Sequence, residues 1–297
     1  MENLTIGIEI EMTGITRKQA ARTLANYFGT TPDYIGGGYD ASQVKDRQGR
    51  TWKVMSDGSL RTETKNARGE TVSAGRLYST EVVSPILKAE DIPMLQEAVR
   101  KLRKAGAFTN DSCGIHIHIG AAPFTPAKIR NLINLVHSKE DILYRTLAVK
   151  PHRESYCKKI DETFLRRLNA RKPKTMAALA DLWYAGNSYD RHAHYNSTRY
   201  HGINLHATFT KGTIEFRLFN STLHAGKIKA YIQFCIALAS QALNQRTASP
   251  KPTETDNEKY TFRCWLLRMG LIGDEYKTCR THLLANLRGN SAWRYAA

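Results

Sequence analysis

The sequence predicts an α+β fold in which a curved, mainly antiparallel sheet has helices on its outer face. Three observations predict it. Short stretches such as LTIGIEIEMT (residues 4–13) alternate apolar and polar residues, which is typical of strands with one buried face. Stretches with helical periodicity lie between them. The two kinds of element follow no regular β-α-β order, which argues against an all-parallel sheet.

The elements of the first 120 residues follow from periodicity and from the residues that begin and end each segment. Thr16 followed by Gln19 is a capping-box pattern at a helix start, and Gly29 is a typical helix end. Pro85 ends a strand because proline lacks the N–H donor that a sheet needs. We expect, in order, a strand over 4–13, a helix over 16–28, a loop at 36–38, a turn and a strand over 48–57, a mobile loop or long hairpin over 58–75, a strand over 76–86, a helix over 91–105 and a strand over 113–120.

The next 125 residues or so predict more helix than sheet. Apolar residues at helical spacing indicate two long helices, and two alternating segments joined by Thr210, Lys211 and Gly212 indicate a hairpin. We expect a helix over 126–149, short helices and loops over 151–195, a hairpin over 200–219 and a helix over 226–244.

The C-terminal part differs in composition from the rest of the chain. Residues 247–259, TASPKPTETDNEK, are polar and contain two prolines, which is typical of a linker. Two helical stretches follow it. We therefore expect one domain over 1–246 and a segment over 247–297 whose helices pack on the same domain.

Composition excludes several classes of protein. The chain has 297 residues, of which 41% are hydrophobic, and it contains no apolar run long enough for a membrane helix and no leader-like N-terminus. Five cysteines without a C-x-x-C pair predict neither a disulfide framework nor a zinc finger and favour the cytoplasm. The net charge of +17, most of it in the second half, keeps nucleic acid and acidic peptides open as partners. The oligomeric state is not predicted.

Two strands place pairs of ionisable side chains opposite isoleucines. In CGIHIHIG (residues 113–120), His116 and His118 share one face because side chains alternate along a strand. Glu9 and Glu11 in GIEIEM repeat this pattern. Like charges side by side repel, more so where water is excluded, and a cation between them removes that cost. Each motif by itself also fits the solvated face of a half-buried sheet.

Further carboxylates and an arginine have the same strand context. They are Glu81 in STEVVSP, Asp57 at a strand end, and Glu215 with Arg217 in TIEFRLF. Carboxylates with an occasional imidazole suit Mg²⁺ or Mn²⁺ better than a structural zinc, and an arginine among them suits an anion. If these strands share one sheet, the polar residues converge on its concave face. With residues 58–75 as a lid, that face would be equipped for phosphoryl transfer.

Six motifs, in this order, resemble those of the amidoligase family of carboxylate–amine ligases. They are GIEIEM, WKVMSDGSL, STEVVSPIL, CGIHIHIG, YHGINLH and TIEFRLFNST, and the match spans about residues 4–245. The resemblance implies a catalytic domain like that of glutamine synthetase and glutamate–cysteine ligase. It also implies that ATP, with Mg²⁺ or Mn²⁺, phosphorylates a carboxylate and that an amine then attacks the acyl phosphate to form an amide.

The resemblance implies roles for individual residues, although the general base is not identified. His201 stands where the family often has an arginine, so the charge of any contact made there would depend on pH. The implied metal ligands are Glu9, Glu11, Glu81 and Glu215. The implied catalytic residues are Asp57, His116, His118 and Arg217. The implied ATP contacts are His116, Arg199, Asn204 and Arg217, and the implied substrate contacts are Asp57, Ser59, His118 and His201.

Two other classes of protein stay open. A metal-dependent hydrolase or phosphoesterase would use the same glutamates and histidines but would need neither ADP formation nor two organic substrates. A basic nucleic-acid-binding protein would tolerate Glu9→Gln and Glu215→Gln and would bind DNA with a strong salt dependence. The sequence has no helix-turn-helix, zinc finger or aromatic-interleaved basic motif in support of that class. The acid and the amine of a ligase are not predicted, nor is whether they are free or borne on a polymer.

Overall fold

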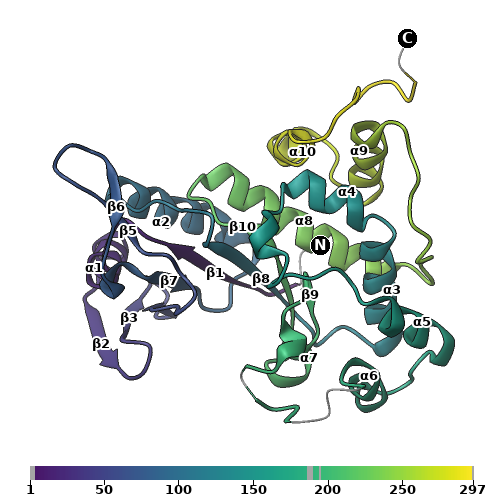
Figure 1. The fold of residues 1–297 in the computed structure, drawn as a ribbon, viewed down its shortest axis with the longest axis horizontal. Coiled ribbons are helices and arrows are strands. Elements are labelled where there is room, and N and C mark those ends of the chain that lie inside the picture. Colours follow the sequence, from purple (N-terminus) through teal and green to yellow (C-terminus); the bar gives the residue numbers. More distant parts are fainter. Residues whose placement is uncertain (1–3, 186–189, 194, 296–297) are drawn as a thin grey trace. The chain divides into compact units, whose positions relative to one another are not determined.

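The computed structural model describes residues 4–185, 190–193 and 195–295, and its fold is α+β with a mainly antiparallel sheet (Figure 1). The chain forms two compact units. The N-terminal unit contains the residues up to Ile117 together with Phe219–Lys229, and the C-terminal unit contains His118–Leu218 and the residues from Ala230 onward. Three elements pass from one unit into the other: β8 (Gly114–Gly120), β10 (Thr213–Asn220) and α8 (Ala225–Asn244).

The N-terminal unit holds most of the strands. Its strand order is β2-β3-β4-β7-β1-β8, and β1 with β7, β7 with β4, β4 with β3 and β3 with β2 pair antiparallel. The predicted hairpin over 58–75 is confirmed as β5 and β6. The bounds are β1 (Ile6–Met12), β2 (Pro32–Gly36), β3 (Ala41–Lys45), β4 (Thr51–Met55), β5 (Glu63–Lys65), β6 (Thr71–Ser73) and β7 (Thr80–Val83).

One face of this sheet is covered by helix α1 (Arg17–Phe28), which starts at the predicted capping box and ends at Gly29. The Phe28 ring lies 5.5 Å from that of Trp52, centroid to centroid. Val54 shares the face of Trp52 and stands opposite Val82, whereas Glu81 stands opposite Met55 on the other face. The carboxylate of Glu81 therefore lies on the face that α1 leaves uncovered. The predicted helix over 91–105 is confirmed as α2 (Ile92–Lys104), which contacts α1.

The C-terminal unit is mainly helical. Strands β8, β10 and β9 (Ile203–Asn204) are neighbours in that order, and β10 pairs antiparallel with β9. Trp265 contacts Phe234 of α8 at 5.8 Å between ring centroids, so the C-terminal helices pack against α8. The boundary at residue 246 stays a prediction. The helices are α3 (Pro126–His137), α4 (Glu140–Leu147), α5 (Glu162–Arg171), α6 (Met176–Trp183), α7 (His206–Thr210), α9 (Glu258–Arg268) and α10 (Lys277–Leu284).

Three sequence-based expectations were wrong in detail, and two strands were not expected. The helix over 126–149 is two helices, because Lys139 leaves the helical conformation with φ near −127°. The link between the hairpin strands is the helical turn α7 rather than a tight turn. Strands β2 and β3, which flank the expected glycine loop, were not predicted. Most side chains of β2 are exposed, so its sequence shows no alternation of buried and exposed residues. The strand over 76–86 begins with a 3₁₀ turn over Arg76–Tyr78.

Within the described part of the chain, no helix has the length and hydrophobicity needed to cross a bilayer. Likewise, no disulfide bond joins the cysteines of the described residues.

Candidate functional site

Two carboxylates and an imidazole meet in the N-terminal unit, and we call Glu11, Glu81 and His116 the acidic cluster. Glu11 of β1 stands directly opposite Glu81 of β7 in the antiparallel register. The three residues are only 4%, 8% and 6% exposed. One ligand atom from each lies within 4.8 Å of the other two. Strand pairing thus brings together three of the residues that the sequence analysis singled out.

The donor set of the acidic cluster fits a divalent cation. Two carboxylates held opposite each other repel, and burial strengthens the repulsion because water no longer screens it. Carboxylate oxygens with one imidazole nitrogen suit Mg²⁺ or Mn²⁺ better than a structural zinc. Glu11, Glu81 and His116 are therefore residues of this unit that could hold such an ion, and the role of Glu9 as a ligand stays a prediction.

The orientation of His116 supports the same interpretation. Its Nδ1 lies 2.9 Å from Oε2 of Glu9, and its Nε2 faces Oε1 of Glu11 at 3.9 Å. A carboxylate only accepts, so Nδ1 carries the proton in this hydrogen bond. In a neutral ring the Nε2 lone pair then points toward Glu11, which is the form in which histidine binds metals. Glu9, predicted as a metal ligand, contacts this imidazole and orients it.

Backbone contacts hold Glu11 in place. The Gly114 amide donates to Oε2 of Glu11 at 2.5 Å, and the Ser221 hydroxyl donates to its carbonyl oxygen at 2.6 Å. These bonds tie β1 to the first residue of β8 and to the segment after β10 within the N-terminal unit. The Gly114 bond therefore positions the carboxylate, and the Ser221 bond positions the strand that carries it.

Asp57 and Ser59, predicted to border a substrate pocket, lie in the same unit and bond to each other. Oδ1 of Asp57 accepts from both the amide and the hydroxyl of Ser59, at 2.7 and 2.5 Å. The Asp57 carbonyl oxygen accepts from the Ser79 hydroxyl. This is the pattern of an Asx turn, which stabilises the chain reversal after β4. Their role toward a substrate stays a prediction.

A second cluster lies in the C-terminal unit, and we call Asn204, Glu215 and Arg217 the arginine cluster. The Glu215 carboxylate accepts from Nη1 of Arg217 at 2.5 Å and from Nδ2 of Asn204 at 2.6 Å. All three residues are at most 5% exposed. Asn204 stands opposite Glu215 in the β9–β10 register, and its Oδ1 accepts from the His206 amide. These bonds fix the guanidinium of Arg217.

His118 lies beside the arginine cluster. Its Nδ1 is 2.9 Å from the Thr213 hydroxyl, and its Nε2 is 4.0 Å from Oε1 of Glu215. Thr213 was not predicted, although it shares the i, i+2, i+4 alternation of β10 with Glu215 and Arg217, and that signal could have found it. The hydrogen bond with the Thr213 hydroxyl orients the imidazole, and Nε2 lies on the side of the Glu215 carboxylate.

Arg153 is a further arginine that the sequence analysis missed. It is 5% exposed, and its Nη2 donates to the carbonyl oxygen of Arg217 at 3.0 Å. Arg153 lies in a short 3₁₀ turn, Pro151–Arg153, within a segment without periodicity, so no local pattern marks it. Its contact with Arg217 appears only when the chain is folded.

His201 and Arg199 lie on the segment that leads into β9. His201 lines a cavity of about 220 Å³ together with Trp183 and Phe164. Burial lowers the pKa of His201, and its Nδ1 donates to the Thr198 carbonyl oxygen, so the ring is neutral near pH 7. Arg199 stacks on the rings of Tyr195 and Tyr200. Their predicted roles in phosphate and substrate binding stay predictions.

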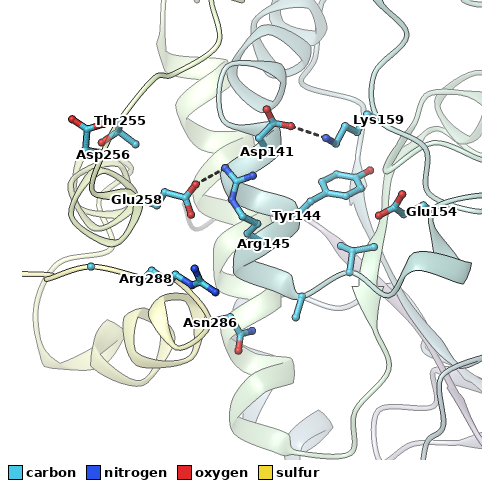
Figure 2. Close-up of a pocket in the computed structure, with 13 residues that line it drawn as sticks. Asp141, Tyr144, Arg145, Glu154, Lys159, Thr255, Asp256, Glu258, Asn286 and Arg288 are labelled. Atoms are coloured by element: carbon cyan, nitrogen blue, oxygen red, sulfur yellow. Dashed lines mark hydrogen bonds and ion pairs between the residues drawn. The ribbon is translucent and has the colours of Figure 1, made fainter.

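A larger cavity of about 960 Å³ lies in the C-terminal unit between α4 and the C-terminal segment (Figure 2). Two ion pairs lie along its wall: Lys159 with Asp141, and Arg145 with Glu258. Glu154, on the turn that follows Arg153, lines the same cavity with Tyr144. Its walls carry charges of both signs and no concentration of either.

Comparison with known proteins places the chain in a family. A family model described as "Putative amidoligase enzyme" matches residues 2–239, which is most of the chain and includes both clusters. A search of curated proteins found no match. The match agrees with the order of the six sequence motifs and leaves the C-terminal helices uncovered. The chain belongs to the amidoligase family.

Proposed function

We propose that this chain is an ATP-dependent carboxylate–amine ligase that forms an amide bond through an acyl phosphate and requires Mg²⁺ or Mn²⁺. We further propose that its catalytic domain has the fold of glutamine synthetase. The observation that carries the proposal is the acidic cluster, in which Glu11 and Glu81 stand opposite each other beside His116. Membership of the amidoligase family supports the ligase chemistry.

The chemistry needs positive charge because phosphate oxygens and a carboxylate repel each other. A bound divalent cation would neutralise that repulsion and orient the phosphates. Glu11, Glu81 and His116 would hold it, and Glu9 would keep the His116 ring in the metal-binding form. The guanidinium of Arg217, held by Glu215, would bind an oxyanion of the reaction.

The proposed reaction has two steps. A carboxylate oxygen of the acid attacks the γ-phosphorus of ATP, and ADP leaves. The amine nitrogen then attacks the acyl carbon, inorganic phosphate leaves, and the nitrogen loses a proton to a base that we do not assign. Acyl phosphates hydrolyse readily, so water must be excluded, and the β5–β6 hairpin is our candidate lid.

The substrates that we propose are small molecules with a carboxylate and an amine, as the ligase family suggests. An acceptor group borne on a polymer would use the same chemistry. The cytoplasm, with its ATP and its reducing conditions, is the setting that we propose for this reaction.

A trapping experiment tests the proposed function. The purified chain is incubated with Mg²⁺-ATP, a pool of amino acids and small carboxylic acids, and hydroxylamine, which intercepts an acyl phosphate. Mass spectrometry then detects ADP and any new hydroxamate. We expect both products from the wild type, and neither from Glu81→Gln or Glu215→Gln.

The matched control is Glu97→Gln, which removes a half-exposed carboxylate on α2 that pairs with Arg100. This variant should form the same hydroxamate as the wild type. Folded wild-type protein that neither binds Mg²⁺-ATP nor forms ADP with any acid of the pool would contradict the proposal. Phosphate release from a single organic substrate without ATP would instead support a hydrolase.

A further inference from the structure

Arg153 is a buried cation that forms no ion pair with the described residues. It is 5% exposed, and none of the described carboxylates lies within ion-pair distance of it. Its Nε is buried and donates to no acceptor in the described part of the chain. Burying a charge without a partner is costly, because the lost hydration is not replaced. Such a group is retained where a ligand supplies the missing partner.

The guanidinium is nevertheless held in one place. Nη2 of Arg153 donates to the Arg217 carbonyl oxygen at 3.0 Å. The backbone around it forms a closed turn, in which the Arg153 amide donates to Lys150 and its carbonyl oxygen accepts from Tyr156 and Cys157. A fixed guanidinium with unused donors is preorganised for an acceptor that arrives from outside the chain.

Arg17 provides a comparison, because it has the same exposed fraction of 5%. Its guanidinium pairs with Asp40 and donates to the carbonyl oxygens of Arg76 and Ser79. That is the set of partners expected of a structural buried arginine. Among the described residues, Arg153 has the Arg217 carbonyl oxygen and the Cys157 thiol as partners, and no carboxylate. Its acidic neighbour in the chain, Glu154, is exposed and lines the cavity beside Tyr144.

Arg153 and Arg217 both lie near the Cys157 thiol. Burial raises the pKa of the Cys157 thiol, and the positive charges of Arg153 and Arg217 both work against that rise. Two guanidinium groups are therefore near one thiol, and Glu215 is the carboxylate that pairs with Arg217.

We propose that Arg153 and Arg217 together bind the carboxylate of the acid substrate, an assignment that rests on the proposed ligase function. The guanidinium fork matches the two oxygens of a carboxylate, which would give Nε of Arg153 its acceptor. Inorganic phosphate presents similar oxygens, so the experiment compares both anions. The turn over residues 150–157 would then position the substrate relative to Arg217.

The test measures anion binding without ATP. The thermal midpoint of the wild type is recorded in acetate, glutarate and inorganic phosphate, each against chloride at equal ionic strength. A ligand that binds only the folded state raises the midpoint. We expect acetate or glutarate to raise that of the wild type. Arg153→Gln should lose the rise, with affinity lower by about tenfold or more, and Arg153→Lys should keep part of it.

Arg17→Gln is the matched control, because it removes an equally buried but fully paired arginine. It should lower the midpoint in chloride and keep the full rise on adding carboxylate. An undiminished rise in Arg153→Gln, or no rise in the wild type with any of the three anions, would overturn the proposal. A rise with phosphate alone would overturn the assignment to a carboxylate.

The result is separable from the proposed function. Arg153-dependent carboxylate binding in a chain that never forms ADP would contradict the ligase function and support the anion site. ADP and hydroxamate formation with an unchanged KM for the acid in Arg153→Gln would support the ligase function and contradict the anion site at Arg153.

Discussion

Glu11 and Glu81 stand directly opposite each other on adjacent antiparallel strands, and both side chains are more than nine-tenths buried. Neighbouring carboxylates in that position repel. The chain keeps them there with a hydrogen bond from the Gly114 amide and a strand register that places His116 beside them. Buried carboxylates that stand opposite each other are expected where a cation is bound.

Replacing one of the two carboxylates tests this relationship. Without divalent metal, Glu81→Gln should raise the free energy of unfolding by about 1 kcal/mol, because it removes the repulsion with Glu11. The same variant should lose the rise in thermal midpoint that Mn²⁺ gives the wild type. Urea unfolding in EDTA and thermal scans with Mn²⁺ measure the two effects, with Glu97→Gln as control. A Mn²⁺-induced rise of equal size in Glu81→Gln would refute the metal site.

The contact between Glu9 and His116 predicts a positioning effect. Glu9→Ala removes the acceptor of the Nδ1 proton, so the ring is no longer held in the metal-binding form. Affinity for Mn²⁺ should fall by about 10- to 100-fold, as it does for such partners of metal-bound histidines. Calorimetric titration gives the affinity, and ¹⁵N NMR of the imidazole reports which nitrogen is protonated. Unchanged affinity together with an unchanged tautomer would show that Glu9 has no such role.

Asn204 and Glu215 predict a difference between two similar substitutions. Asn204→Asp replaces the donor of a 2.6 Å hydrogen bond with a second carboxylate facing Glu215. It should lower stability by about 3 kcal/mol and abolish activity, whereas Asn204→Ala should cost less because it adds no charge. Asn286→Asp is the control, since Asn286 donates to the Thr146 carbonyl oxygen rather than to a carboxylate. Equal stabilities of Asn204→Asp and Asn204→Ala would count against a charged Glu215.

Glu140 predicts a pH dependence of stability. Burial raises the pKa of this carboxyl from 4.5 to about 7, while its Oε1 accepts from the Ile160 amide. Between those pH values the folded state keeps the proton that the unfolded state has released, so stability falls as pH rises from 4.5 through 7. Glu140→Gln keeps the acceptor and cannot ionise. Its advantage in unfolding free energy should grow from near zero at pH 4.5 to about 3 kcal/mol above pH 7.

Asp141, on the same helix, gives a control of opposite sign. Its hydrogen bond with Lys159 lowers the pKa of this carboxyl, so its contribution to stability is present at neutral pH and is lost as pH falls. Asp141→Asn should therefore be less stable than the wild type at pH 7 and approach it in acid.

Parallel pH profiles for Glu140→Gln and the wild type would mean that Glu140 is ionised in the folded chain at neutral pH.

The elements that could be predicted from the sequence are those in which one face is buried, because apolar residues then recur with the period of a strand or a helix. Strand β1 and the first helix are confirmed because isoleucines mark one and Thr16 with Gln19 marks the start of the other. The break between α3 and α4 could not be predicted, since Ser138 and Lys139 are ordinary helix residues and neither glycine nor proline ends α3. Strand β2 was missed because its exposed side chains depend on pairing with β3 rather than on a buried face.

The candidate site could be predicted in part for the same reason. The motifs E-x-E and H-x-H indicated Glu11 and His116 by alternation, but the register that sets Glu11 opposite Glu81 is a long-range pairing that no local pattern contains. Arg153 lies in a turn, and its significance arises from burial beside Arg217. Local periodicity thus identifies the strands, whereas the contacts between residues of different strands and turns are seen only in the folded structure.

The most direct test is a crystal structure of the chain grown with Mn²⁺ and a non-hydrolysable ATP analogue, with anomalous diffraction data. We predict an anomalous peak within bonding distance of carboxylate oxygens of Glu11 and Glu81 and of Nε2 of His116. Ordered side chains at these three positions with no anomalous peak among them would contradict the central claim that the acidic cluster is a divalent-cation site.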